Sequence, residues 1–205
     1  MSPVLESVFR SAAFLGLFAV VGTSLIDWTH HQTQKRIAEN ERTALLQRFH
    51  ELIPAAWYDN DILSDKRVIG DKGFPESPSS ITVYRIRKYQ TNVAVVIATQ
   101  APDGYNGTIK LLVAIRENGE LVGVRVVAHR ETPGLGDGIE ESRSNWVRQF
   151  AGRSLDRPYE NGWAVKRDGG VFDQFTGATI TPRAIVNAVR RTLIYYRNYK
   201  TELFE

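Results

Sequence analysis

The longest uncharged stretch of the chain runs from Ser11 to Ile26, close to the N-terminus. As a helix, its 16 residues would span about 24 Å, slightly less than the ~30 Å hydrocarbon core of a bilayer. Trp28 follows and suits a membrane interface. The pattern favours residues 1–28 as a short tail and an uncleaved anchor. A cleaved signal peptide is the alternative, although no small-x-small cleavage site follows the run.

Residues 29–55 have the pattern of a helix that leaves the membrane. One face is apolar, charged residues fill the remainder, and Pro54 ends the pattern. This connecting helix would be either a stalk or a helix packed on the following domain. The apolar face comprises Ile37, Ala44, Leu45, Phe49 and Leu52.

Strand patterns follow a stretch rich in Asp, Gly, Pro and Ser between residues 58 and 80, where we expect loops and short strands. Residues 81–89 alternate in polarity, and residues 93–98 are continuously apolar. Residues 110–115 and 121–127 flank the pair Asn118-Gly119, which predicts a β-hairpin.

The remaining pattern predicts helices and short strands. Apolar spacing predicts a helix over residues 139–150 and a last helix over residues 182–196, capped by Thr181 with Pro182 as its first residue. Short strands containing Val165 and Val171 are expected between them. Residues 56–205 therefore read as one α+β domain built on an antiparallel sheet with flanking helices.

Composition excludes several kinds of chemistry. The 205 residues contain no cysteine, which removes disulfides, thiol catalysis and cysteine-ligated clusters. The formal net charge is +3, and basic residues are scattered among acidic ones, so no nucleic-acid surface is indicated. The four histidines form no metal-ligand pattern, so we expect no metal site.

The run from Asp173 to Pro182 places hydroxyl groups at the predicted start of the last helix. A helix N-terminus has unpaired N–H groups and a positive dipole end, and both favour a phosphate. Thr179 would hold its hydroxyl there, next to the small residues Gly177 and Ala178. An ordinary capped helix is the alternative explanation of the same pattern.

A second glycine-rich segment, from His129 to Gly138, follows the second strand of the hairpin. Gly134, Gly136 and Gly138 permit positive φ and close approach of the backbone to a ligand. The spacing matches neither the dinucleotide fingerprint nor a Walker loop, so an ordinary strand-to-helix loop is the alternative.

Together the two segments resemble the FMN-binding domain family of two ion-pumping redox complexes, Rnf (Rsx) and the sodium-pumping NADH:quinone reductase. Asp-x-x-Ser/Thr-Gly-Ala-Thr is the family site at which a flavin transferase attaches FMN through its phosphate. The resemblance implies attachment at Thr179, with Asp173, Thr176, Gly177 and Ala178 completing the motif. The run from Glu131 to Gly136 matches the second family motif.

If a flavin is bound, several residues in and near the two motifs are candidates to lie beside it. His129 would either respond to the flavin or hold its loop by hydrogen bonds, and Arg130 or Lys166 would stabilise reduced flavin. No catalytic residue beyond the cofactor is expected. The candidates for flavin contact are Glu131, Thr132, Gly134, Leu135, Gly136, Trp163 and Lys166.

Chain length and motifs resemble the G subunits of Rnf-type complexes most. The resemblance implies an electron-relay protein in a bacterial inner membrane, a translocase component that works only with partner subunits. It also implies a cytoplasmic tail and a periplasmic FMN domain, although positive charges after the anchor oppose that orientation. The alternatives are the C subunit of the quinone reductase and a non-redox, membrane-anchored assembly module.

Overall fold

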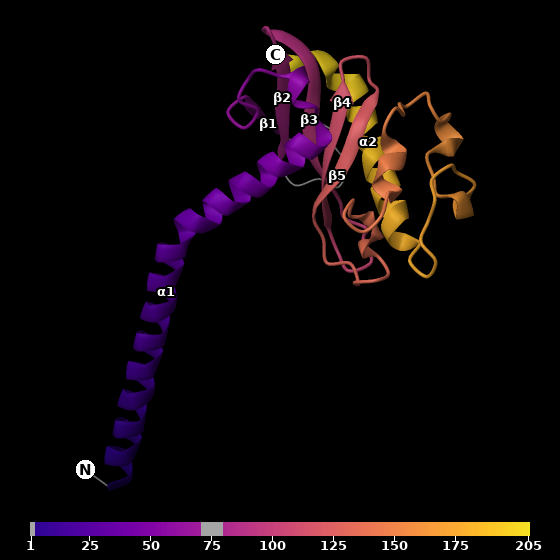
Figure 1. Cartoon of the computed structure of the whole chain (residues 1–205). Helices are drawn as coiled ribbons and strands as arrows, with labels where there is room; N and C mark the ends of the chain where they lie inside the picture. Colours follow the sequence, from indigo (N-terminus) through magenta and orange to yellow (C-terminus); the bar gives the residue numbers. More distant parts are fainter. Residues whose placement is uncertain (1–2, 71–79) are drawn as a thin grey trace. The chain divides into compact units, whose positions relative to one another are not determined.

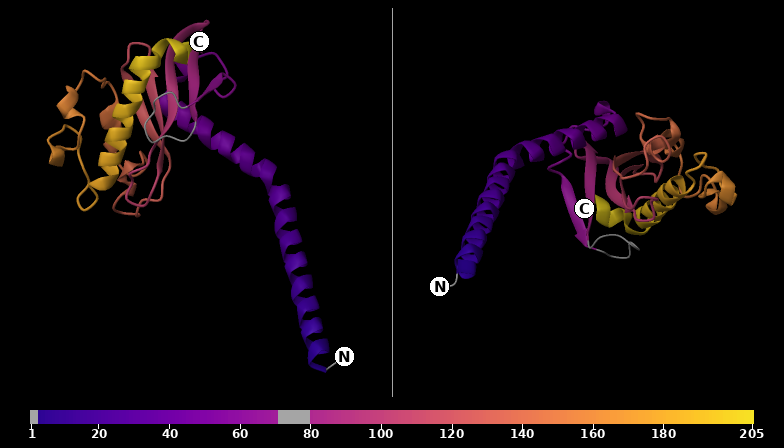
Figure 2. Two further views of the ribbon diagram at one scale, coloured as in Figure 1. Left: turned by 180° about the vertical axis from the view of Figure 1, so that it is seen from behind. Right: turned by 90° about the horizontal axis from the view of Figure 1, so that it is seen from below.

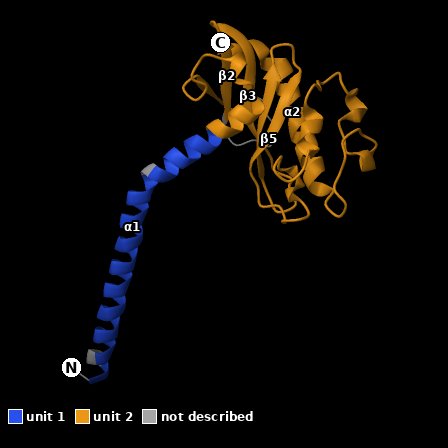
Figure 3. Ribbon diagram, viewed as in Figure 1, with its two compact units in different colours: residues 1–45 blue, residues 46–205 orange. Residues whose placement is uncertain are grey.

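The computed structural model describes residues 3–70 and 80–205 and divides into two compact units, residues 1–45 and 46–205 (Figure 3). The first helix, α1 (Pro3–Leu52), begins in the first unit and ends in the second. Nothing interrupts α1 between the predicted anchor and the predicted connecting helix. The domain boundaries at residues 28 and 55 therefore remain a prediction.

The first unit is an apolar helix whose large side chains are exposed. Ser7–Gln34 is long and apolar enough to cross a membrane, with a mean hydropathy of 1.7. Phe14, Leu15 and Phe18 are each more than half exposed, so no protein core covers them. An exposed apolar helix of this length is expected where lipid, rather than protein, surrounds it.

The second unit contains the predicted antiparallel sheet (Figure 1). Its order along the sheet is the order along the chain, and each strand pairs with the next. Gly119 has a φ of +86° in the β4–β5 turn, as the Asn-Gly hairpin signal predicts. The strands are β1 (Lys66–Gly70), β2 (Ser80–Lys88), β3 (Thr91–Ala101), β4 (Ile109–Arg116) and β5 (Leu121–Ala128).

Both faces of the sheet are covered, since successive side chains of a strand point to opposite faces and neighbours such as Val83 and Tyr84 are both buried. The last helix, α2 (Ile180–Phe204), packs on one face (Figure 2) and shares a core with Val83 and Val95. Tyr84 points to the opposite face, where its ring lies 4.9 Å from that of Phe49 in the last turns of α1. The end of the predicted connecting helix is therefore packed on the domain.

The helix predicted over residues 139–150 is wrong. The segment forms two short 3₁₀ turns, Asp137–Ile139 and Trp146–Phe150. Between them, the hydroxyl of Ser144 donates to the carbonyl of Gly138 at 2.6 Å and accepts the N–H of Trp146 at 3.1 Å. These side-chain bonds compete with helical backbone bonds and divide the segment.

The predicted start of the last helix is also wrong, by two residues. Helix α2 begins at Ile180 with Thr179 as its N-cap residue, rather than at Pro182 with Thr181 as the cap. Thr181 is buried and its hydroxyl donates to Glu131, while the N–H of Arg183, which a cap at Thr181 would accept, donates to the carbonyl of Thr179. Pro182 remains within the first turn, where its missing N–H costs no helical bond.

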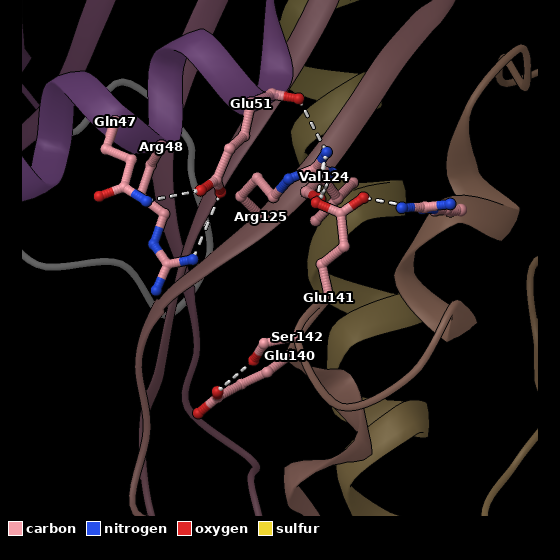
Figure 4. Close-up of polar contacts among 9 residues, drawn as sticks. Gln47, Arg48, Glu51, Val124, Arg125, Glu140, Glu141 and Ser142 are labelled. Atoms are coloured by element: carbon pink, nitrogen blue, oxygen red, sulfur yellow. Dashed lines mark hydrogen bonds and ion pairs between the residues drawn. The ribbon is translucent and has the colours of Figure 1, made fainter.

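Arg125 on β5 links three parts of the second unit (Figure 4). Its guanidinium donates to the carbonyl of Glu51 at the end of α1 and to that of Val124, both at 2.9 Å. It also forms a 2.7 Å ion pair with Glu141, which in turn pairs with Arg148 at 2.8 Å. Burial lowers the pKa of Arg125, and the charge of Glu141 opposes that shift. The contact ties α1 to the loop that follows the second glycine-rich segment.

Candidate functional site

The two motif segments, which are distant in sequence, line one open pocket of about 370 Å³ in the second unit. Such a volume lies in the range of small-molecule sites. The lining mixes exposed apolar side chains with backbone and hydroxyl groups. It consists of Tyr105, Glu131, Thr132, Leu135, Gly136, Gly177, Ala178, Thr179, Ile180 and Thr181.

Thr179 occupies the N-cap position of α2 and is half-buried at the pocket. Its backbone is helical, with a φ of −77° and a ψ of −27°, and its hydroxyl makes no capping bond. Among the described residues, neither that hydroxyl nor the backbone N–H groups of Ile180 and Thr181 have a hydrogen-bond partner. The site thus combines a free hydroxyl with the positive end of a 25-residue helix.

The turn before Thr179 is held by its own backbone and by contacts with Trp146. Gly177 has a φ of +82°, which favours glycine, and the N–H of Ala178 donates to the carbonyl of Phe175 at 3.1 Å. The indole N–H of Trp146 donates to the carbonyl of Asp173 at 2.6 Å, and its ring lies 5.5 Å from that of Phe175. Trp146 therefore supports the motif from the 3₁₀ turn that contains it.

The second motif forms a tight turn that lines the same pocket as the first. The N–H groups of Leu135 and Gly136 both donate to the carbonyl of Thr132, at 3.1 and 3.0 Å. Gly134 has a φ of +78°, and its N–H donates to the carboxylate of Asp137 at 2.8 Å. These bonds present Leu135, which is half exposed, to the pocket.

His129 holds the start of this turn. Its Nδ1 accepts the N–H of Glu131 at 3.0 Å, so in the neutral ring the proton sits on Nε2 and is donated to Glu140 at 2.7 Å. The bond from His129 lowers the pKa of the Glu140 carboxyl, and Ser142 adds to the effect. Of the two roles open to His129, these contacts support the hydrogen-bonded loop role.

Asp173 and Lys166 form an ion pair at the surface, and both are more than half exposed. Asp168 and Arg183 form a second, two-bonded pair at 2.6 and 2.9 Å. The Arg183 guanidinium lowers the pKa of Asp168, and the carboxylate raises the pKa of Arg183 in return. Asp173, the acidic residue of the first motif, is not among the residues that line the pocket.

Trp163 and Lys166, both predicted as flavin contacts, do not line the pocket. Trp163 is in the core, where its ring lies 5.2 Å from that of Phe172 and 6.5 Å from that of Phe150, and its indole N–H donates to the carbonyl of Ser154 at 3.2 Å. Arg130 is exposed and also absent from the pocket lining. Contact of these residues with a flavin remains a prediction without support from the pocket.

Three residues of the pocket were not among the predicted contacts: Tyr105, Ile180 and Thr181. Tyr105 lies between Gly104 and Gly107 in a turn before β4, and this glycine spacing is the signal that could have identified it. Ile180 and Thr181 belong to the run from Asp173 to Pro182, and they form the first turn of α2 because the helix begins at Ile180 rather than at Pro182. This first turn lines the pocket.

The pocket suits the FMN that the resemblance implies. The exposed side chains of Tyr105, Leu135 and Ile180 offer apolar surface for a ring system. Thr179 offers a hydroxyl at the helix start, where a phosphate is favoured. A ring and a phosphate of one cofactor could therefore be held together by residues of a single pocket.

Comparison with known proteins gives two family matches. The FMN-binding domain family matches residues 104–194, and the RnfG N-terminal region matches residues 1–52. A protein of Shewanella baltica, named as the G subunit of an ion-translocating oxidoreductase complex, is 43% identical over 96% of this chain and 93% of its own length. A protein of the same name from Pseudomonas aeruginosa is 47% identical, over 93% of this chain and 89% of its own length.

Among solved structures, NqrC of Shewanella oneidensis is 20% identical, with a TM-score of 0.49. The superposition covers 74% of this chain and 73% of that chain.

Proposed function

The chain belongs to the family of G subunits of ion-translocating oxidoreductase complexes, and from this premise we propose that it is an electron relay with FMN attached covalently to Thr179. The flavin would pass electrons between partner subunits of a membrane complex that couples this flow to ion movement. Redox chemistry would come from the flavin, while the chain binds, orients and shields it.

The free hydroxyl of Thr179 is the observation on which the proposal rests. A capping threonine would normally accept a bond at the helix start, but this hydroxyl makes none within the described residues. Its position in the pocket lined by both motifs supports attachment there. Thr132 also lines the pocket but does not belong to the start of α2, and its hydroxyl accepts a bond from the side-chain amide of Asn106 at 3.1 Å.

Attachment needs a separate flavin transferase and FAD. The Oγ1 of Thr179 forms a bond to the flavin-side phosphorus of FAD, the pyrophosphate bond breaks, and AMP leaves. The hydroxyl proton passes to a base of the transferase. The dipole of α2 would stabilise the added phosphate charge in the product.

Single-pass insertion in the bacterial inner membrane, with the FMN domain in the periplasm, is part of the same proposal. Ser7–Gln34 supports a single span. A covalent bond would keep the cofactor in a compartment from which free FMN is lost. Cysteine-accessibility labelling in intact cells tests the orientation, because the chain has no cysteine of its own and single cysteines can be introduced. A cysteine at an exposed position in residues 80–205 should react with a reagent that does not cross the inner membrane.

The experiment that tests attachment compares Thr179→Ala with Thr132→Ala in the full chain, each co-expressed with a flavin transferase. Flavin fluorescence in a denaturing gel should persist in the wild type and in Thr132→Ala. It should disappear in Thr179→Ala, because no hydroxyl remains to form the phosphoester. A flavin band that persists in Thr179→Ala would move the attachment site, and an unlabelled wild type would favour the non-redox assembly module.

A further inference from the structure

Glu131 is a buried carboxylate in the pocket, with only 4% of its surface exposed. The hydroxyl of Thr181 donates to its Oε2, and the backbone N–H of Asn106 donates to its Oε1 at 3.1 Å. No cation pairs with it in the described part of the chain. Burial of a charge without a counter-ion is costly, so the bonds made by Glu131 need an explanation beyond filling space.

The backbone around Glu131 is shaped to the carboxylate. A Cβ on Gly136 would lie 3.0 Å from Oε2 and 3.2 Å from the hydroxyl of Thr181. A Cβ on Gly104 would lie 2.9 Å from Oε1, although its closest contact would be the carbonyl oxygen of Gly107 at 2.2 Å. Each carboxylate oxygen thus lies against a glycine, and a methyl group at Gly136 would press on the carboxylate and on Thr181. The chain encloses this hydrogen-bonded pair with little room for another arrangement.

The pair joins segments that are otherwise separate in sequence. Glu131 belongs to the second motif, and Thr181 lies in the first turn of α2, two residues after Thr179. Through Asn106, the same carboxylate also contacts the turn that contains Tyr105. The negative charge lies at the positive end of α2, where the helix dipole favours it.

We propose that Glu131 and Thr181 form a clamp, a pair of positioning residues that fixes the first turn of α2 and so sets the position of the Thr179 hydroxyl for flavin attachment. This inference rests on the proposed attachment at Thr179. Without the clamp, the N-terminal turn of α2 would fray, since the Thr179 side chain makes no capping bond there. Thr179 would then sample positions in which transfer cannot occur.

Helix α2 contains a matched control for this proposal. Thr192 is as buried as Thr181, and its hydroxyl donates to the carbonyl of Ala188 at 2.8 Å within the same helix. It does not line the pocket. Thr192→Val therefore removes a buried hydroxyl bond from α2 without touching the clamp, and any effect of general destabilisation should appear in it too.

The first measurement is the rate at which a flavin transferase and FAD label full-length variants in detergent, at a temperature where all of them are folded. Thr181→Val should slow labelling on the order of tenfold, because small displacements of a reacting group are costly. Thr181→Ser, which keeps the donor, and Thr192→Val should label at nearly the wild-type rate. Labelling of Thr181→Val at the wild-type rate, or equal slowing by Thr192→Val, would overturn the clamp.

Hydrogen–deuterium exchange in the unlabelled full-length protein provides a second measurement that does not involve flavin. Thr181→Val should speed exchange in both residues 131–136 and the first hydrogen-bonded amides of α2, which begin at Arg183, since the clamp connects the two segments. Thr192→Val should leave residues 131–136 unchanged. If the wild type is never labelled, the attachment proposal fails, and unchanged exchange of residues 131–136 in Thr181→Val would independently overturn the clamp.

Discussion

Gly134 and Gly136 lie two residues apart in one turn, yet alanine should destabilise the domain at each for a different reason. Gly134 has a φ of +78°, and a Cβ there would meet nothing within 4 Å. Gly136 has an ordinary φ of −93°, but its Cβ would lie 2.9 Å from the Cβ of Glu131. Backbone conformation limits the first position, and packing limits the second.

The expected magnitudes follow from these two causes. Gly134→Ala should lower the free energy of unfolding by about 1–2 kcal/mol, the cost of a left-handed conformation for an L-residue. Gly136→Ala should lower it by about 1–3 kcal/mol through overpacking against Glu131 and Thr181. Because these ranges overlap, alanine alone cannot separate the two causes.

Asparagine separates them. It tolerates the left-handed region, so Gly134→Asn should be less destabilising than Gly134→Ala. A larger side chain worsens the contact at the other position, so Gly136→Asn should be at least as destabilising as Gly136→Ala. Denaturant unfolding of full-length protein in detergent, followed by tryptophan fluorescence, measures all four variants.

The opposite order at Gly136 would refute this reasoning. If Gly136→Asn were more stable than Gly136→Ala, backbone conformation and not the contact with Glu131 would limit that position. A Gly134→Asn variant less stable than Gly134→Ala would show that space, which the structure leaves open there, is in fact restricted.

Three further predictions concern the supports of the site. Trp146→Phe removes the bond to the Asp173 carbonyl and should cost about 1 kcal/mol by denaturant unfolding while slowing flavin labelling. Phe49→Ala should cost about 3–5 kcal/mol in the same assay, because its buried ring packs on Tyr84. The pKa of Glu140 is lowered from its ordinary value of 4.5, so its ionised carboxylate contributes stability above pH 4.5, and this contribution is lost as pH falls through the lowered pKa. Glu140→Gln should therefore flatten the acid limb of a plot of melting temperature against pH.

Local patterns predicted the sheet well, because each strand is defined by its own residues. Alternation in residues 81–89 and the Asn118-Gly119 turn are short-range signals, and both match the structure. The helix predicted over residues 139–150 failed, since its apolar residues are anchored by separate tertiary contacts and the hydroxyl of Ser144 breaks the helical bonds. Helical spacing alone does not distinguish these cases.

The motifs predicted two sides of the pocket but not the contact between them. Thr179 and Leu135 line the same pocket, as expected for residues of two segments that bind one ligand. The pairing of Glu131 with Thr181 joins residues 50 positions apart, and no local pattern encodes it. The same contact holds Thr181 inside the first turn of α2 rather than at its N-cap, since the N–H of Arg183 already donates to the carbonyl of Thr179.

Trp163 illustrates the limit of composition as a guide to ligand contact. An aromatic residue near glycines suits either a ring contact or a core, and only packing decides between them. Here Trp163 packs in the core beside Phe172 and Phe150, with its N–H already bonded to Ser154. The pocket instead takes its aromatic side chain from Tyr105, in a turn before β4.

Peptide mass spectrometry of the chain purified from its native membranes tests the covalent attachment of FMN most directly. After denaturation and proteolysis, we predict the mass of FMN, less one water, on the peptide that contains Thr179, with fragment ions that assign it to that residue. The Thr132 peptide of the same digest should be unmodified. Unmodified Thr179 in protein from an active complex, or flavin attached to any other residue, would contradict the proposed attachment.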